Sequence, residues 1–168
     1  NGEGEVVSGI ALQRFGENAL SVIEKGTGLV SLGGDHFVTY PLLKAHANVH
    51  GPLALVHFDA HRDVEPDDGD RIDHGTMFNY AVRDGLIDPK RSIQVGIRTF
   101  TPDSQCFPVL DARWLLAHGV YACLEEIRER VGTSKCYVSF DVDFLDPAFA
   151  PGTGTPVVGG FDTHTALR

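Results

Sequence analysis

Three side chains of metal-ligand type stand at alternate positions in residues 59–63, where single residues separate Asp59, His61 and Asp63. They follow an apolar run at residues 53–58 that is typical of a buried strand in a parallel sheet. If the backbone stays extended, alternate side chains point to one face and the three groups lie together. Two carboxylates and an imidazole at a strand end predict part of a metal site. The alternative, in which Asp59 caps a helix and Asp63 lies on the surface, fits a buried strand poorly.

Two further apolar runs also end in ligand-type residues. One predicted strand spans residues 137–143 and closes with alternating carboxylates, and another at residues 29–32 leads into a Gly-Gly-Asp-His sequence. In open α/β sheets, ligands gather at the carboxyl ends of the strands, so we expect these groups to meet. They are too many for one tetrahedral zinc ion and suit two metal ions that share carboxylates. The candidate metal ligands are His36, Asp59, His61, Asp63, Asp141 and Asp143.

The composition of this ligand set favours a particular metal. Carboxylates outnumber imidazoles, and hard oxygen donors suit manganese better than zinc, so we expect two Mn²⁺ ions, with iron, cobalt, nickel and zinc as alternatives. A bound metal strongly lowers the pKa of a coordinated water, and two ions can share one hydroxide. The residues therefore predict hydrolysis by a metal-activated water.

The elements that must position these residues alternate along the chain. We predict strands at residues 29–32, 53–58, 92–97 and 137–143, and helices at residues 6–25, from Thr39 or Tyr40 onwards, and at residues 77–85, 111–117 and 125–131. The first helix is expected to be interrupted near Gly16. This β-α-β pattern predicts an α/β fold, a three-layer α/β/α sandwich with a mainly parallel sheet. We expect residues 1–168 to form a single domain.

The charge balance restricts the class of partner. Lysine and arginine number 14, against 23 aspartates and glutamates, which gives a formal net charge of −9. Such a surface disfavours nucleic acid and anionic membranes and favours a small cationic substrate. No apolar run is long enough to span a membrane, no signal peptide is visible, and Cys106, Cys123 and Cys136 lack C-x-x-C spacing. We therefore expect free thiols and a cytoplasmic location.

Three motifs of the chain resemble the signature motifs of the ureohydrolase family, which includes arginases and agmatinases. These motifs are Gly33-Gly34-Asp35-His36, Asp59-Ala60-His61-Arg62-Asp63 and Ser139-Phe140-Asp141-Val142-Asp143. They occur in the family's order and strand context, and they span most of the chain. The stretch at residues 73–78 and the loop at residues 147–160 look most like the agmatinase branch.

The resemblance implies an arginase-like fold and a binuclear manganese site. By the family's pattern, one metal would be held by His36, Asp59, Asp63 and Asp141, and the other by Asp59, His61, Asp141 and Asp143. Asp59 and Asp141 would therefore bridge the two ions. The implied reaction is the hydrolysis of agmatine to putrescine and urea, by attack of a metal-bridging hydroxide on the guanidinium carbon.

Two catalytic side chains also follow from the resemblance. His74 matches the family's active-site histidine, and a group that titrates near neutrality suits proton transfer. The alternative for His74 is a loop histidine that caps the helix at Thr76. Asp63 would hold the hydroxide by a hydrogen bond as well as ligate a metal. We also expect the full-length protein to be a homo-oligomer.

Three other functions are compatible with parts of this residue pattern. The same reaction could act on arginine or guanidinobutyrate, but the acidic loop at residues 64–73 would repel a substrate carboxylate and favour agmatine. A deacetylase with a single zinc ion needs fewer ligands than the two carboxylate-rich motifs supply, which argues against this function. An inactive metal-binding fragment would be expected to have lost some of them.

The ends of the chain predict a partial domain. The chain begins at Asn1 rather than Met, and it stops at Arg168 inside an expected helix. Family members carry a guanidinium-binding glutamate beyond the last carboxylate pair, and this chain stops before that position. We therefore expect an internal piece of a longer protein, truncated at both ends.

Overall fold

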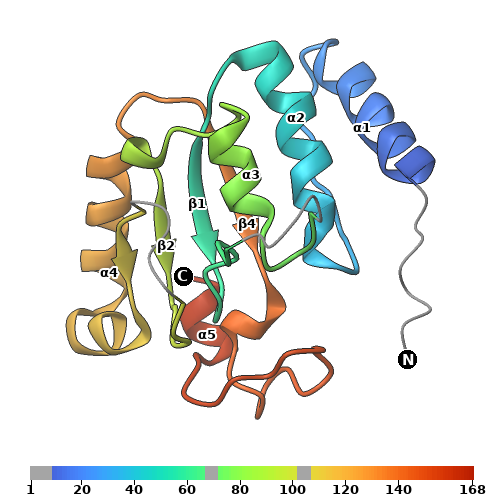
Figure 1. Cartoon of the computed structure of the whole chain (residues 1–168). Helices are drawn as coiled ribbons and strands as arrows, with labels where there is room; N and C mark the ends of the chain where they lie inside the picture. Colours follow the sequence, from blue (N-terminus) through green and yellow to red (C-terminus); the bar gives the residue numbers. More distant parts are fainter. Residues whose placement is uncertain (1–8, 67–71, 102–106) are drawn as a thin grey trace.

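A computed structural model describes residues 9–66, 72–101 and 107–168, and these residues build one sheet of four parallel strands (Figure 1). The strands are β1 (Ala54–Phe58), β2 (Ile93–Val95), β3 (Val109–Leu110) and β4 (Cys136–Phe140). Their order in the sheet is β3-β2-β1-β4, so that β1 is a central strand and β4 forms an edge. Parallel neighbours need crossover connections, and α3 (Met77–Arg83) lies in the connection from β1 to β2.

Helices cover both faces of the sheet. On one face, α2 (Thr39–His50) and α3 (Met77–Arg83) pack around Leu55. On the other face, α4 (Ala112–Val131) packs against Val56, the next residue of β1. Successive residues of a strand point to opposite faces, so β1 supplies the core of both layers. This arrangement confirms the predicted α/β fold with a parallel sheet between helices.

The remaining helices are peripheral. α1 (Gly9–Ile23) packs on α2, and the short α5 (Thr163–Ala166) lies on the α4 side of the sheet (Figure 1). Three short 3₁₀ helices complete the described elements: η1 (His36–Val38), η2 (Pro89–Arg91) and η3 (Val142–Phe144). Within the described ranges, no helix is long and apolar enough to cross a membrane.

A layer of polar side chains crosses the sheet near the ends of three strands. His57 of β1 pairs with Gln94 of β2 on one side and with Ser139 of β4 on the other. Each stands one residue before the end of its strand, and all three are buried. Buried polar side chains need hydrogen-bond partners, so we expect these three residues to contact other polar groups at the carboxyl end of the sheet.

The predicted strand at residues 29–32 is not formed. Val30 and Leu32 are almost fully exposed, and the segment has no strand structure. Residues 31–34 and residues 137–140 of β4 line a cavity of about 250 Å³. This cavity lies between the segment and the edge of the sheet. The apolar composition favours a strand, but a strand also needs a neighbour for its backbone hydrogen bonds, and none of the described strands is paired with this segment.

Two helix predictions also differ from the structure. α1 runs through Gly16 without interruption, because packing on α2 outweighs the low helix propensity of glycine. Residues 6–8 of that predicted helix lie outside the described residues. The predicted helices at 111–117 and 125–131 are joined in α4, which bends at Gly119, where a φ of 80° interrupts the helical backbone.

Candidate metal centre

The three motif segments share one local device at the end of the sheet. In each, an aspartate oxygen accepts a hydrogen bond from the backbone N–H two residues further on, which closes a tight turn. The pairs are Asp35 with Phe37 at 2.9 Å, Asp59 with His61 at 2.6 Å, and Asp141 with Asp143 at 2.9 Å. The turn uses the Oδ1 atom of each carboxylate and leaves Oδ2 directed elsewhere.

The predicted extended backbone over residues 59–63 is wrong. β1 ends at Phe58, and Asp63 has a φ of 53°, in a left-handed region that residues other than glycine rarely adopt. In the same way, β4 ends at Phe140, and Asp141 caps the N-terminus of η3. The side chains therefore converge because the backbone bends around them, and not because they alternate along a strand.

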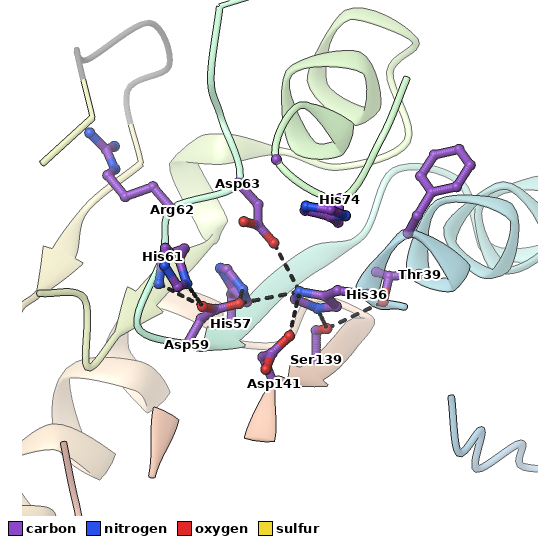
Figure 2. Close-up of polar contacts among 12 residues, drawn as sticks. His36, Thr39, His57, Asp59, His61, Arg62, Asp63, His74, Ser139 and Asp141 are labelled. Carbon is purple, nitrogen blue, oxygen red and sulfur yellow. Dashed lines mark hydrogen bonds and ion pairs between the residues drawn. The ribbon is translucent and has the colours of Figure 1, made fainter. Parts of the chain in front are cut away.

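The first cluster of ligand atoms surrounds the Nδ1 atom of His36 (Figure 2). This nitrogen lies 3.2 Å from Oδ2 of Asp59, 2.8 Å from Oδ2 of Asp63 and 3.3 Å from Oδ2 of Asp141. The other ring nitrogen, Nε2, is 2.7 Å from the Ser139 hydroxyl, so the ring is held with Nδ1 facing the carboxylates.

The geometry of this cluster fits a metal ion. His36 Nδ1 is buried, yet none of the nearby oxygens lies in hydrogen-bonding geometry with it. A buried polar atom without a hydrogen bond is rare and needs an explanation. One nitrogen and three carboxylate oxygens that converge without hydrogen bonds match the donor set of a divalent cation that prefers oxygen.

The second cluster adjoins the first through Asp59. His61 Nδ1 lies 2.9 Å from Oδ2 of Asp143 and 3.4 Å from Oδ1 of Asp59, whose Oδ2 belongs to the first cluster. Asp143 is fixed by hydrogen bonds from the backbone of Ala60 at 3.0 Å and from the Thr155 hydroxyl at 3.2 Å. Asp59 therefore faces both clusters with different oxygens, which suits a carboxylate that bridges two ions.

The structure thus brings all six predicted ligands to one end of the sheet. His36, Asp59, Asp63 and Asp141 share the first cluster, and Asp59, His61 and Asp143 share the second. The distances place Asp141 beside His36, and its predicted contact with the second metal stays a prediction.

Both cluster histidines carry strongly shifted pKa values. Burial lowers the pKa of His36, but its contacts with Asp59 and Asp63 outweigh burial and raise that pKa to about 10. The contacts of His61, first with Asp143 and then with Asp59, raise its pKa to about 10 despite partial burial. The pKa values are raised because several carboxylates surround each imidazole and stabilise its protonated form. The same negative charge would attract a divalent cation.

The carboxylates of the centre respond differently to burial. Burial raises the pKa of Asp63 and of Asp141. Burial acts on Asp59 in the same direction, but the imidazoles of His57 and His36 reverse the effect and hold the pKa of Asp59 far below its usual range. Asp59 is therefore the carboxylate whose charge the surrounding protein supports most strongly.

His74 lies at the same cavity but outside both clusters. Its Nδ1 atom is 3.0 Å from Oδ2 of Asp35, and both side chains are exposed. The cavity measures about 690 Å³ and is also lined by Glu65 and by residues 152–155. The structure therefore places the predicted proton carrier at the mouth of the site, together with part of the loop at residues 147–160 that resembles the agmatinase branch.

Several supporting residues were not predicted from the sequence. His57 Nε2 lies 2.8 Å from Oδ2 of Asp59, and Gln94 contacts His57 from β2. The signal for His57 was present, since it continues the alternate spacing of Asp59 and His61 by one step. Arg98 was also missed, and its guanidinium donates to five backbone carbonyls, those of Gly96, Asp143, Phe144, Leu145 and Val157.

A family model described as the arginase family matches residues 4–168, and the chain belongs to this family. The chain is 54% identical over 154 residues to the agmatinase of Chromobacterium violaceum, a match that covers 90% of this chain and 48% of that protein. It is 48% identical over 157 residues to the agmatinase of Neisseria meningitidis serogroup C, which covers 94% and 51%. The chain therefore spans about half the length of the curated relatives it matches.

Solved structures agree with this assignment. A hypothetical agmatinase from Burkholderia thailandensis matches with a TM-score of 0.89 and 54% identity over 93% of this chain and 50% of that one. The proclavaminate amidino hydrolase of Streptomyces clavuligerus matches with a TM-score of 0.82 and 38% identity over 94% and 56%. The arginase of Bacillus subtilis, at 23% identity over 94% of this chain and 62% of its own, shares the fold with a TM-score of 0.84.

Proposed function

We propose that the protein containing this chain hydrolyses agmatine to putrescine and urea. The observation that carries the proposal is the pair of adjoining ligand clusters around His36 and His61, which face one cavity. Relatives that are 48% to 54% identical over most of this chain are named agmatinases. The alternatives, arginine and guanidinobutyrate, would use the same centre and differ in the far end of the substrate.

Metal binding is part of this proposal. The residues that would hold two ions are the six of the clusters, and their oxygen-rich composition favours Mn²⁺. When bound, such ions supply a water of lowered pKa and polarise the guanidinium group. The free thiols of Cys123 and Cys136 support a reducing compartment, and we place the protein in the cytoplasm.

The chain's own side chains would handle the protons. Asp63 contacts His36 through Oδ2 and has a second oxygen with which to hold the attacking water. The leaving amine needs a proton, and His74 at the cavity mouth can deliver it. Asp35 holds the His74 ring through Nδ1, which leaves Nε2 for the substrate.

Negative charge at the cavity mouth supports agmatine over arginine. Glu65 lines the cavity, and Asp73 lies where the acidic loop returns to His74. The loop acids Asp67, Asp68 and Asp70, on which the same prediction relied, lie outside the described residues. An acidic mouth repels the α-carboxylate of arginine and attracts the free amine of agmatine.

The test is urea release by the full-length protein, loaded with Mn²⁺, on agmatine, arginine and guanidinobutyrate. We expect the highest kcat/KM for agmatine. We also expect Glu65→Gln to reduce the ratio of kcat/KM for agmatine to kcat/KM for arginine. Glu129→Gln, an exposed change on α4, removes the same charge away from the cavity and serves as the control. A preference for arginine, or equal effects of the two variants, would contradict the substrate assignment.

A further inference from the structure

A chain of buried polar groups lies behind the carboxylate that the two clusters share. Starting from Arg62, it passes through Gln94 and His57 and ends on Asp59. All four side chains are buried, and those of Gln94 and His57 have no exposed surface. None of these groups except Asp59 has a place in the mechanism described above, so their burial needs another reason. Each link has a defined donor and acceptor, and the links together fix a proton on one atom.

The first link fixes the orientation of the Gln94 amide. Its Nε2 atom donates to the backbone carbonyl of Arg62 at 2.6 Å, and its Oε1 atom accepts from Nε of Arg62 at 3.1 Å. Turning the amide over would place oxygen against carbonyl oxygen and N–H against N–H. Arg62 therefore holds Gln94 with its NH₂ group in one position.

The second link fixes the tautomer of His57. The Gln94 NH₂ group lies 3.1 Å from His57 Nδ1, and because it is a donor, Nδ1 must accept and carry no proton. The proton of a neutral ring then sits on Nε2, which lies 2.8 Å from Oδ2 of Asp59 and donates to it. The register of the sheet makes this possible, since His57 and Gln94 are paired across β1 and β2.

The last link restrains Asp59 from its buried side. Its Oδ1 atom accepts from the backbone N–H of His61 at 2.6 Å, and its Oδ2 atom accepts from His57. With both oxygens held, the carboxylate has one orientation, in which Oδ1 faces the second cluster and Oδ2 faces the first (Figure 2). Asp59 is almost completely buried, so water cannot take over either hydrogen bond.

We propose that His57 is a positioning residue for the metal centre: its Nε2–H, fixed by Gln94 and Arg62, orients Asp59 to bridge two ions. His57 lies close enough to His36, Asp59 and Asp63 to be taken for a ligand itself. Its Nδ1 atom faces the Gln94 amide, and its ring is fully buried and does not line the cavity that His36 and His61 line, so we assign it a supporting role and not that of a ligand. The inference rests on the proposed function only in that the two ions are those of the proposed hydrolase.

The tautomer can be observed directly in the unmodified protein. Neutron diffraction from crystals of the deuterated full-length protein locates deuterium on histidine nitrogens. We expect deuterium on Nε2 of His57, directed at Asp59, and none on Nδ1, with and without Mn²⁺. Deuterium on Nδ1, or a metal ion bound to Nε2, would overturn the proposal. This observation requires no variant to fold and no substrate to be turned over.

A pair of matched variants tests the consequence. In His57→Gln the amide reaches the Nε2 edge of the lost ring and can still donate to Asp59, whereas in His57→Asn it reaches only the Nδ1 edge. Loss of a hydrogen bond to a metal ligand typically costs about 10- to 100-fold in metal affinity. We expect His57→Asn to lose Mn²⁺ affinity by this factor and His57→Gln to keep most of the affinity of the unmodified protein. Calorimetric titration of the full-length protein with Mn²⁺ measures both affinities.

A general structural role for His57 predicts something else. In that case the two variants would lose affinity together, in proportion to their loss of thermal stability without metal, and this result would overturn the proposal. If neither variant folds, the neutron result on the unmodified protein decides. If affinity separates as expected while no guanidino substrate yields urea, the proposed function fails and the positioning role stands.

Discussion

The two halves of the candidate centre have very different surroundings. Asp59 follows the central strand β1, and His57 and Asp59 are 0% and 1% exposed. Both ring nitrogens of His57 and both carboxylate oxygens of Asp59 have hydrogen-bond partners. Asp141 follows the edge strand β4, where Val138 is 63% and Phe140 46% exposed. Ligand residues of similar chemistry thus stand on one strand that is packed on both sides and on another that has an open side.

His36 belongs with the open half. It follows the segment that contains Val30 and Leu32, which are 88% and 96% exposed. Its ring is nevertheless held, through Ser139 and the carboxylates. The β1 half of the centre is therefore organised by packing on both sides, whereas the β4 half stands on a strand with exposed apolar side chains.

The largest expected effect comes from comparing two substitutions, each of which removes one carboxylate charge from one half of the centre. Both Asp59→Asn and Asp141→Asn should lose both ions, because each removes a proposed bridge. Without metal, Asp59→Asn should cost about 3 kcal/mol, since it breaks a buried charged pairing, and Asp141→Asn less than about 1 kcal/mol. Metal content by mass spectrometry and denaturant unfolding in chelator measure the two quantities.

His36→Asn is the control for this pair and should weaken mainly one ion, since His36 belongs to the first cluster. Two ions per chain in Asp141→Asn would refute its bridging role. Equal loss of stability in the two aspartate variants would refute the difference between the halves.

The next effect concerns the link between the halves. Arg98 follows β2 and binds the carbonyls of residues 143–145, which follow β4, and that of Val157. Arg98→Met leaves these carbonyls without their charged donor and should cost about 2–3 kcal/mol in unfolding free energy. Arg98→Lys, which keeps the charge but not the branched guanidinium, should recover only part of it. Full recovery by lysine would show that charge alone matters.

A smaller effect should come from the open edge itself. Val138 belongs to the edge strand β4 and exposes its apolar side chain, and exposed apolar edge strands promote self-association. We expect Val138→Lys to raise the concentration at which residues 1–168 associate by about tenfold, or about 1.4 kcal/mol. Tyr121→Lys, at an exposed aromatic of α4, is the control. Sedimentation velocity measures association, and equal effects of both changes would argue against the edge as the cause.

The smallest effect should come from a contact between helices that belongs to neither half. The Tyr40 hydroxyl of α2 donates to Asp84 after α3, and this bond holds the pKa of Asp84 below its usual value. Tyr40→Phe should cost about 1 kcal/mol at neutral pH. Because the folded-state pKa is depressed, this contribution is complete above the unfolded pKa of about 4 and is lost as pH falls through the folded value.

Urea unfolding of the natural protein and of Tyr40→Phe between pH 7 and pH 3 checks this sign. The difference in stability between the two should shrink as the solution becomes more acidic. A difference that grows on acidification would show that Asp84 is not the partner that matters. Unchanged Mn²⁺ affinity in this variant would confirm that the contact is independent of the centre.

The sequence by itself determined the residues of the centre and the class of fold. Asp59, His61, Asp141 and Asp143 could be selected because carboxylates and imidazoles that follow apolar runs are a local pattern. The parallel sheet followed from the alternation of strands and helices. These features depend on side-chain chemistry and on hydrophobic spacing, both of which can be read along the chain.

Only the tertiary structure decided how the centre is held. Residues 29–32 have the composition of a strand, yet a strand exists only where a neighbour completes its hydrogen bonds, and no local pattern reveals that neighbour. The left-handed backbone at Asp63 and the Gln94–His57 contact across two strands likewise depend on partners far apart in sequence. His57 lies inside an apolar run, and its role appears only when the sheet places Gln94 on one side of the ring and Asp59 on the other.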